Sequence, residues 1–171
     1  MLFEEYVKEN RSYFLDKVEE ISRKLMIAPE WLMAVMYKES KLNHKAVNST
    51  SGATGLIQFM PSTAQGLGTS TTALKNMSNI EQLDYVYKYY RPYVMKLNSY
   101  PDLYLATFFP KALGKSDDYV MQTSSLSAST IARQNPAIDI NKDGKITVAE
   151  FKQYCYSQFD TATQNILKKK V

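Results

Sequence analysis

Apolar residues recur every three or four positions along three stretches of the first hundred residues. The first stretch contains Phe3, Val7, Phe14, Val18, Ile21 and Leu25, the second runs from Trp31 to Met36, and the third contains Leu83, Val86, Tyr87, Tyr90, Val94 and Leu97. This spacing predicts helices over about residues 3–25, 29–40 and 80–97. Pro29 suits the first turn of the second helix, whereas Pro92 must kink or end the third. The sequence therefore predicts a mostly α-helical fold.

The chain is long enough to bury one sizeable core. Its 171 residues are 44% apolar, which is ordinary for a globular protein and favours one domain with a small appendage. We expect a main body over residues 1–115, and a serine- and threonine-rich connector with a further helix over 116–171, packed on the same body. A single cysteine, Cys155, excludes an intrachain disulfide.

The charge balance is mildly basic, with 21 Lys and Arg against 17 Asp and Glu. An excess of this size favours an anionic surface as partner without requiring one. No basic run with interleaved aromatic residues is present, so we do not expect nucleic acid as a partner, and we interpret Lys168–Lys170 as a solvated tail. No apolar run approaches membrane-spanning length, so we expect no membrane insertion.

Glu39 continues the apolar stripe of the second helix, where a charge is unfavourable. It follows Leu32, Val35 and Met36 at helical spacing, near the expected C-terminal end of the helix. Partial burial and the negative end of the helix dipole both disfavour the ionised carboxylate, so we expect a raised pKa. A carboxyl group that stays protonated can act as a general acid in glycoside cleavage. The alternative is an amphipathic edge residue with its carboxylate in water.

The segment after this helix is polar and contains no second carboxylate. Residues 41–80 include no Asp or Glu, although they are rich in Ser, Thr, Asn and Gly. His44 lies in the part expected to be a loop, residues 41–54, and without a metal cluster or a nucleophile beside it we expect an ordinary surface histidine. Pro61 predicts the start of a short helix that Gly66 and Gly68 end, before a turn at 69–72.

Two short motifs in this region resemble the soluble lytic transglycosylase (SLT) family of the lysozyme superfamily. They are the Glu39-Ser40 pair and the segment GATGLIQFMPSTA at residues 52–64, and the resemblance covers about residues 20–115. It implies a lysozyme-like fold of the goose-type and SLT kind, with a cleft between the 29–40 and 80–97 helices that residues 41–72 close. It also implies that Glu39 is the single acid and base, that Ser40 helps to orient the substrate, and that Gly55, Leu56 and Gln58 line a sugar cleft.

A third segment, LYLATFFPKALG at residues 103–114, resembles a phage-type version of the family pattern. Many members carry Ala-Tyr-Asn-Ala-Gly there, and Phe108 or Phe109 cannot supply the hydroxyl or amide of that Tyr-Asn pair. Tyr104 is our candidate for a substrate-binding role, with a core tyrosine as the alternative. Tyr85, Tyr89 and Tyr93 share one helical face, where they either pack or stack on sugar rings.

Residues 139–150, DINKDGKITVAE, match the twelve-residue calcium loop of an EF-hand at every defined position. The predicted ligands are the side chains of Asp139, Asn141, Asp143, Thr147 and Glu150 and the carbonyl of Lys145. Gly144 permits the sharp turn. Regulatory EF-hands usually come in pairs, but here one loop stands alone and Pro136 interrupts its approach. We therefore expect structural Ca²⁺ that fastens a helix over about 148–159, and no cofactor for catalysis.

The resemblance implies a peptidoglycan lytic transglycosylase, an enzyme that cleaves the bond between N-acetylmuramic acid and N-acetylglucosamine and forms a 1,6-anhydro ring. One alternative is a muramidase that hydrolyses the same bond with water, using Glu81, Asp84 or Asp102 as a distant base. Another is a non-catalytic wall-binding module of a virion.

The first residues carry acids where a secretory signal needs basic residues, and no apolar core follows them. A wall-cleaving chain of this kind would need another delivery route. We expect delivery as a virion component, through a lysis pore, or by a secretion machine, with phage-tail or secretion proteins as partners.

Overall fold

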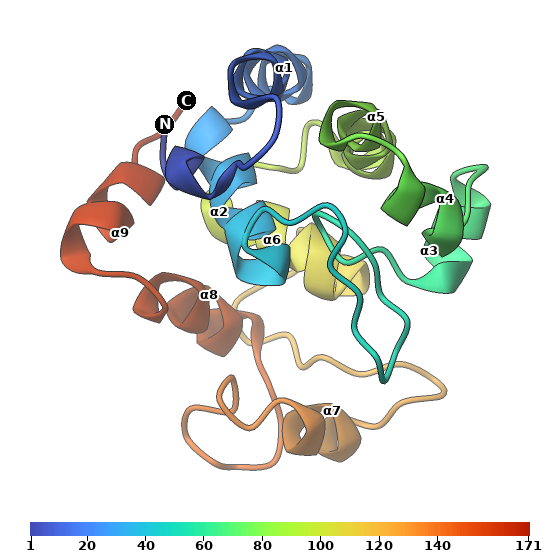
Figure 1. Ribbon diagram of the computed structural model, residues 1–171. Helices are drawn as coiled ribbons and strands as arrows, with labels where there is room; N and C mark the ends of the chain where they lie inside the picture. The colour runs from blue at the N-terminus through green and yellow to red at the C-terminus, as the bar shows by residue number, and fades with distance from the viewer. The chain divides into compact units, whose positions relative to one another are not determined.

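The computed structural model describes residues 1–171 and consists of helices and loops, without strands (Figure 1). The α-helices are α1 (Arg11–Leu25), α2 (Pro29–Ser40), α3 (Pro61–Gly66), α4 (Thr71–Asn76), α5 (Asn79–Tyr90), α6 (Tyr100–Phe108), α7 (Ala128–Gln134), α8 (Val148–Ser157) and α9 (Thr161–Leu167). Short 3-10 helices are η1 (Glu4–Tyr6), η2 (Arg91–Tyr93) and η3 (Pro110–Ala112). The prediction of a mostly α-helical fold is confirmed.

The chain divides into two compact units. Unit 1 comprises Met1–Leu97 with Lys170–Val171, and unit 2 comprises Asn98–Lys169. This division differs from the boundary at residue 115 expected from the sequence, because α6 packs against α8 and therefore groups with the C-terminal segment.

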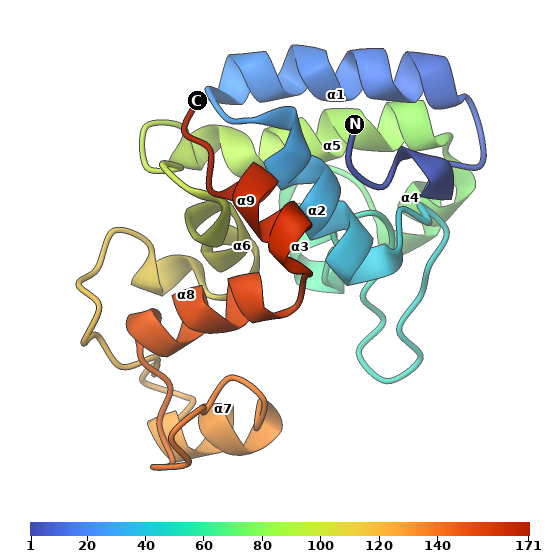
Figure 2. The same ribbon diagram turned by 90° about the vertical axis from the view of Figure 1, so that its left-hand side faces the viewer.

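In unit 1, α1 packs against both α2 and α5, and α1 and α5 lie side by side along their length (Figure 2). The buried face of α1 is the one that the sequence predicted, with Phe14, Val18, Ile21 and Leu25 almost fully enclosed. Residues Trp31 to Met36 of α2 are all buried as well. Burying a large apolar side chain contributes about 1.5–3 kcal/mol, so these two helices form the centre of the unit 1 core.

The prediction of one helix over residues 3–25 is wrong in its first third. The chain forms η1, and α1 begins only after Asn10, whose backbone is left-handed with φ 52°. Asn79 of α5 explains the break, because its side-chain amide donates to the carbonyl of Glu9 at 2.7 Å and its oxygen accepts from Asn10 at 3.2 Å. Asparagine adopts the left-handed backbone conformation more readily than most non-glycine residues. The hydrogen bonds with Asn79 therefore stabilise a break at Asn10 where the sequence predicted a continuous helix.

The other helices of unit 1 follow their start and stop signals. Helix α2 has the predicted bounds, and α3 begins at Pro61 and ends at Gly66. The third predicted helix stops at Tyr90, and a short 3-10 turn that contains Pro92 follows it. The turn expected at 69–72 is wrong, because Ser70 caps α4 by accepting from the Ala73 amide at 3.0 Å.

Unit 2 is built around α6 and α8. Its core contains the fully buried rings of Tyr100 and Phe151. The sequence predicted α8 but not α7 or α9, which are seven residues each and carry too few apolar positions to show a period. Serine and aspartate caps begin both short helices, at Ser127 and Asp160. None of the helices in the structure combines the length and the apolar character that crossing a membrane requires.

Candidate active site

Glu39 lies in the last turn of α2, where the helix passes from the core to the surface. Its side chain is half-buried, one turn after the buried Met36. The chain then leaves the helix through Lys41 and Leu42, which both have left-handed backbones, with φ 53° and 60°. Two such residues in succession cost about 1–2 kcal/mol each, and backbone strain of this kind concentrates at functional sites.

Ser40 ties the end of α2 to the second motif. Its hydroxyl oxygen lies 2.9 Å from the carbonyl oxygen of Leu56 and 3.1 Å from that of Met36, and it donates its single proton to these two acceptors. The hydroxyl therefore fixes the distance between the Glu39 turn and residues 55–58. A role in orienting substrate, which the resemblance implied, stays a prediction.

The turn of residues 55–58 is the structural centre of the second motif. Gly55 has φ +88°, and a Cβ added there would meet the amide oxygen of Gln82 at 2.5 Å, so only glycine fits. The side chain of Leu56 is fully buried and anchors the turn in the core. Gln58, also left-handed, donates its side-chain amide to the carbonyls of Gly55 and Ala46 at 3.1 and 3.2 Å. These predicted cleft residues thus form one hydrogen-bonded turn.

Gln82 of α5 anchors this turn, and sequence reasoning missed it. Its side chain is fully buried; its oxygen accepts from the Leu56 amide at 2.6 Å, and its nitrogen donates to the carbonyls of His44 and Leu74 at 2.9 Å each. A buried amide with both polar atoms satisfied is a strong specifier of one local structure. The sequence does contain one indication of this role: Gln82 is a polar residue on the apolar face of the predicted helix, next to Leu83 and Val86.

Aromatic rings gather around Tyr89 of α5. The ring of Tyr89 makes edge contacts with Phe59 at 6.4 Å and Tyr90 at 5.1 Å, and its centroid lies 6.1 Å from that of Tyr93. Burial raises the pKa of the Tyr89 hydroxyl, and the negative charges of Tyr93 and Glu39 raise it further. Tyr89 thus stays a protonated donor near the Glu39 carboxyl group, on the tyrosine face that the sequence indicated.

The third segment forms part of the core of unit 2. Tyr104 is half-buried and packs edge-on against Tyr100 and Phe151, with centroids 6.1 and 5.7 Å apart. Phe108 stacks on the same Phe151 ring at 5.2 Å. These contacts agree with the core alternative for Tyr104, while its substrate-binding role stays a prediction.

The loop of residues 139–150 brings three predicted metal ligands together. Oxygen atoms of Asp139, Asp143 and Glu150 all lie within 4.8 Å of one another. Asp139 accepts from the amides of Asp143 at 3.2 Å and Gly144 at 3.0 Å, which closes the sharp turn at Gly144, where φ is +82°. Like charges held this close repel one another, and the binding of a cation between them stays a prediction.

Residues 119–121 of the connector pair with this loop. The Met121 amide donates to the Ile146 carbonyl at 2.9 Å, and the Val148 amide donates to the Tyr119 carbonyl at 3.0 Å. In an EF-hand pair the second loop supplies contacts of this kind, so the connector explains how a single loop is supported. Thr147 and Glu150 also form a reciprocal capping box that begins α8.

His44 is buried, so the prediction of an ordinary surface histidine is wrong. Its side chain is only 6% exposed, its Nε2 atom has no hydrogen-bond partner, and burial lowers the pKa of the imidazole. Glu9 opposes this pKa shift and Lys45 adds to it. The polar composition of residues 41–54 predicted exposure, but Gln82 draws the His44 backbone inward through its carbonyl.

A pH dependence of stability follows from this burial. The unfolded chain protonates His44 below about pH 6.5, whereas the folded chain keeps it neutral to lower pH. The stabilising effect is therefore complete above pH 6.5 and is lost as the pH falls below it. We expect the melting temperature of the parent to fall more between pH 7.5 and 5.5 than that of His44→Gln. Equal falls would contradict this expectation.

Comparison with known protein families gives a match within the first unit. Residues 16–87 match the family described as Transglycosylase SLT domain. Among curated proteins, none is similar enough to the chain to be matched. The matched segment contains Glu39, Ser40 and the turn of residues 55–58, and the helical architecture is that of the lysozyme-like fold. The match supports the SLT family within the lysozyme-like superfamily, whose members are transglycosylases that cleave peptidoglycan glycan strands.

Proposed function

We propose that this chain is a peptidoglycan lytic transglycosylase with Glu39 as its acid and base. The observation that carries the proposal is the position of Glu39: it is half-buried beside Tyr89, and the motif residues of the SLT-matched segment hold its turn in place. No Asp or Glu lies between residues 40 and 80, so the motif region offers no second carboxylate.

The proposed reaction needs one proton carrier. Glu39 donates its proton to the glycosidic oxygen, and the bond from that oxygen to C1 of N-acetylmuramic acid breaks. The C6 hydroxyl of the same sugar then attacks C1 and returns its proton to Glu39. The products are a free 4-hydroxyl on N-acetylglucosamine and a 1,6-anhydro ring, with no water consumed. Tyr89 supplies a neutral hydroxyl near the Glu39 carboxyl group throughout.

A muramidase would require a second carboxylate to activate water. Asp84 is an unsuitable base because it is 60% exposed and forms an ion pair with Lys17 of α1 at 2.8 Å. Glu81 is exposed in the first turn of α5, and Tyr89 follows it eight positions later in the same helix, a rise of about 12 Å. The third candidate, Asp102, belongs to unit 2, where its carboxylate accepts from the Asn98 amide at 3.0 Å. The positions of Asp84 and Glu81 favour the transglycosylase over a muramidase that uses either of them.

Digestion of purified peptidoglycan tests the proposed class of reaction. The protein should reduce the turbidity of the wall suspension without releasing new amino groups, because it cuts glycan strands and leaves peptide bonds intact. Release of amino groups would identify a peptide-cleaving enzyme, and binding without any clearance would identify the non-catalytic wall-binding module.

The phage-type third segment supports a further proposal about delivery. We expect the chain to act on the wall as a virion component, or after release at lysis, with phage-tail or secretion proteins as partners. Detection of the chain in purified particles by mass spectrometry would support the first route.

The loop of residues 139–150 would hold Ca²⁺ in a structural role. Its donors are all oxygen atoms, from Asp139, Asn141, Asp143, Thr147 and Glu150 and the carbonyl of Lys145, and a flexible set of this kind suits Ca²⁺ better than Mg²⁺. The ion would offset two of the three negative charges of Asp139, Asp143 and Glu150 and fasten the start of α8. Because the loop belongs to unit 2 and Glu39 to unit 1, we assign no catalytic step to it.

Calcium should raise the melting temperature clearly while changing activity little. An ion that binds only the folded state adds about 2.7 kcal/mol at one hundred times its dissociation constant. Glu150→Gln should abolish the calcium-dependent rise, since glutamine keeps the capping box but removes the charge. Glu19→Gln on the exposed face of α1 is the matched control. Calorimetry with and without chelator measures both, and a rise that persists in Glu150→Gln would refute the structural role.

A further inference from the structure

Residues 117–121 of the connector pair with the second half of the loop of residues 139–150 and with the start of α8. Four backbone pairings join these segments. The amide of Met121 donates to the carbonyl of Ile146 at 2.9 Å, those of Val148 and Ala149 donate to the carbonyls of Tyr119 and Asp117 at 3.0 and 2.9 Å, and Val120 and Thr147 form an antiparallel bridge. The connector is therefore hydrogen-bonded to the part of the loop that carries the later ligands.

The loop positions that pair with the connector alternate with the proposed calcium ligands. Ile146 lies between two of these ligands, the carbonyl of Lys145 and the side chain of Thr147. The Ile146 carbonyl, which accepts from Met121, belongs to the same planar peptide unit as the Thr147 amide. That amide donates to the Glu150 carboxylate at 3.1 Å. The orientation of this ligand carboxylate is thus linked to the pairing with the connector.

Side chains also hold the connector in place. The side chain of Met121 is fully buried. At the other end of the segment, Asp117 forms an ion pair with Lys152 of α8 at 2.7 Å. The ammonium of Lys111 donates to the carbonyl of Gln122 at 3.2 Å. The two lysine contacts are exposed and contribute little to stability, so the buried methionine is the main anchor of the segment.

We propose that calcium binding in the loop stabilises the ordered connector, and that the connector in turn raises the affinity of the loop for calcium. The proposal rests on the structural calcium proposed above. Without the ion, the like charges of Asp139, Asp143 and Glu150 favour an open loop, and opening removes the pairing partner of residues 117–121. Because the two equilibria are linked, each favours the other by the same factor.

Amide hydrogen exchange of the parent protein, followed by nuclear magnetic resonance with and without calcium, tests the first half of the proposal. The Met121 amide should exchange at least about 10-fold more slowly at one hundred times the dissociation constant. An ion bound only to the closed loop can slow opening-dependent exchange by up to about 100-fold at that concentration. An unchanged Met121 rate beside a calcium-dependent rise in melting temperature would overturn the coupling and leave the structural calcium in place. If neither quantity changed, both proposals would fall.

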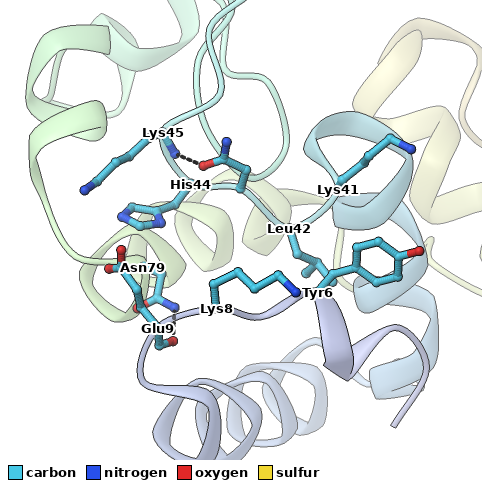
Figure 3. Close-up of a pocket in the computed structure, with 9 residues that line it drawn as sticks. Tyr6, Lys8, Glu9, Lys41, Leu42, His44, Lys45 and Asn79 are labelled. Atoms are coloured by element: carbon cyan, nitrogen blue, oxygen red, sulfur yellow. Dashed lines mark hydrogen bonds between the residues drawn. The ribbon is translucent and has the colours of Figure 1, made fainter.

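His44 provides an internal control in unit 1. It lines a cavity with Tyr6, Leu42 and Asn79, and every residue of that wall belongs to unit 1 (Figure 3). Because it is the only histidine, its imidazole signals are identified without ambiguity. These signals should stay unchanged when calcium slows the Met121 amide. Calcium shifts at His44 as large as those at Met121 would indicate a general effect of the ion and contradict a coupling confined to the connector.

A substitution of the buried anchor tests the second half of the proposal. Met121→Ala should weaken calcium binding about 3- to 10-fold, because the shortened side chain no longer holds the connector beside the loop. Leu167→Ala removes a buried side chain from α9 of the same unit and should bind calcium as the parent does. Titration calorimetry below the melting temperature of each variant measures the affinity. Equal affinities in Met121→Ala and the parent would overturn the reciprocal effect, and the exchange measurement decides the coupling even if Met121→Ala does not fold.

Discussion

Replacing Glu39 by glutamine should lower the rate of wall cleavage at least about 100-fold while the protein stays folded. The amide has the shape of the carboxylic acid but cannot deliver a proton to the leaving oxygen, and loss of a positioned general acid typically costs about 10²- to 10⁴-fold. The half-buried position of Glu39 tolerates a neutral amide without loss of packing. Clearance of purified walls measures the rate, and the melting temperature checks the fold.

Glu30→Gln is the matched control for this experiment. Glu30 lies in the first turn of the same helix and is also half-buried, so it reports the effect of losing one carboxylate from α2. We expect its activity to stay near that of the parent. Substantial activity in Glu39→Gln would remove Glu39 from the catalytic role.

Replacing Gln82 by leucine should lower the free energy of unfolding by about 3 kcal/mol or more. The change leaves three buried backbone groups without partners, the Leu56 amide and the carbonyls of His44 and Leu74, and each costs about 1–3 kcal/mol. The same change should reduce wall cleavage, since Gln82 holds the turn that Ser40 contacts. Urea denaturation measures the stability.

Two further variants distinguish the loss of the Gln82 hydrogen bonds from the general effect of replacing a glutamine. Gln82→Glu keeps an acceptor for the Leu56 amide but turns a carboxylate toward two carbonyls, so it should also destabilise the protein. Gln65→Leu, on the exposed side of α3, should change stability by less than about 0.5 kcal/mol. If Gln82→Leu were as stable as Gln65→Leu, the turn would not depend on Gln82.

Local signals in the sequence were sufficient to predict the helices that position Glu39. Pro29 fixes the start of α2, the apolar run from Trp31 to Met36 fixes its buried face, and Pro92 limits α5. Each of these features depends only on residues within a few positions along the chain. They can therefore be read from a single sequence. Short helices such as α7 escaped prediction because one or two turns give too few positions for a period.

Long-range contacts account for most of what the sequence did not reveal. Asn79 interrupts the first predicted helix at Asn10, which is 69 residues away, and Gln82 reaches 26 residues back to Leu56 and 38 back to His44. In each case a polar side chain on one helix satisfies the backbone of another segment, and the sequence pattern of either segment alone contains no trace of the pairing. The positions of Glu39, Ser40 and Gly55 were recognisable because a motif, not periodicity, marks them.

The mass of the muramic acid ends released from purified peptidoglycan tests the central proposal most directly. In a lytic transglycosylase, the C6 oxygen of N-acetylmuramic acid replaces the leaving oxygen at C1 of the same sugar. Every new end should therefore be a 1,6-anhydro ring, one water lighter than the hydrolysis product. Digestion in ¹⁸O-labelled water should therefore leave these ends unlabelled. An increase in reducing muramic ends during the digestion would contradict the account and show that the chain is a muramidase.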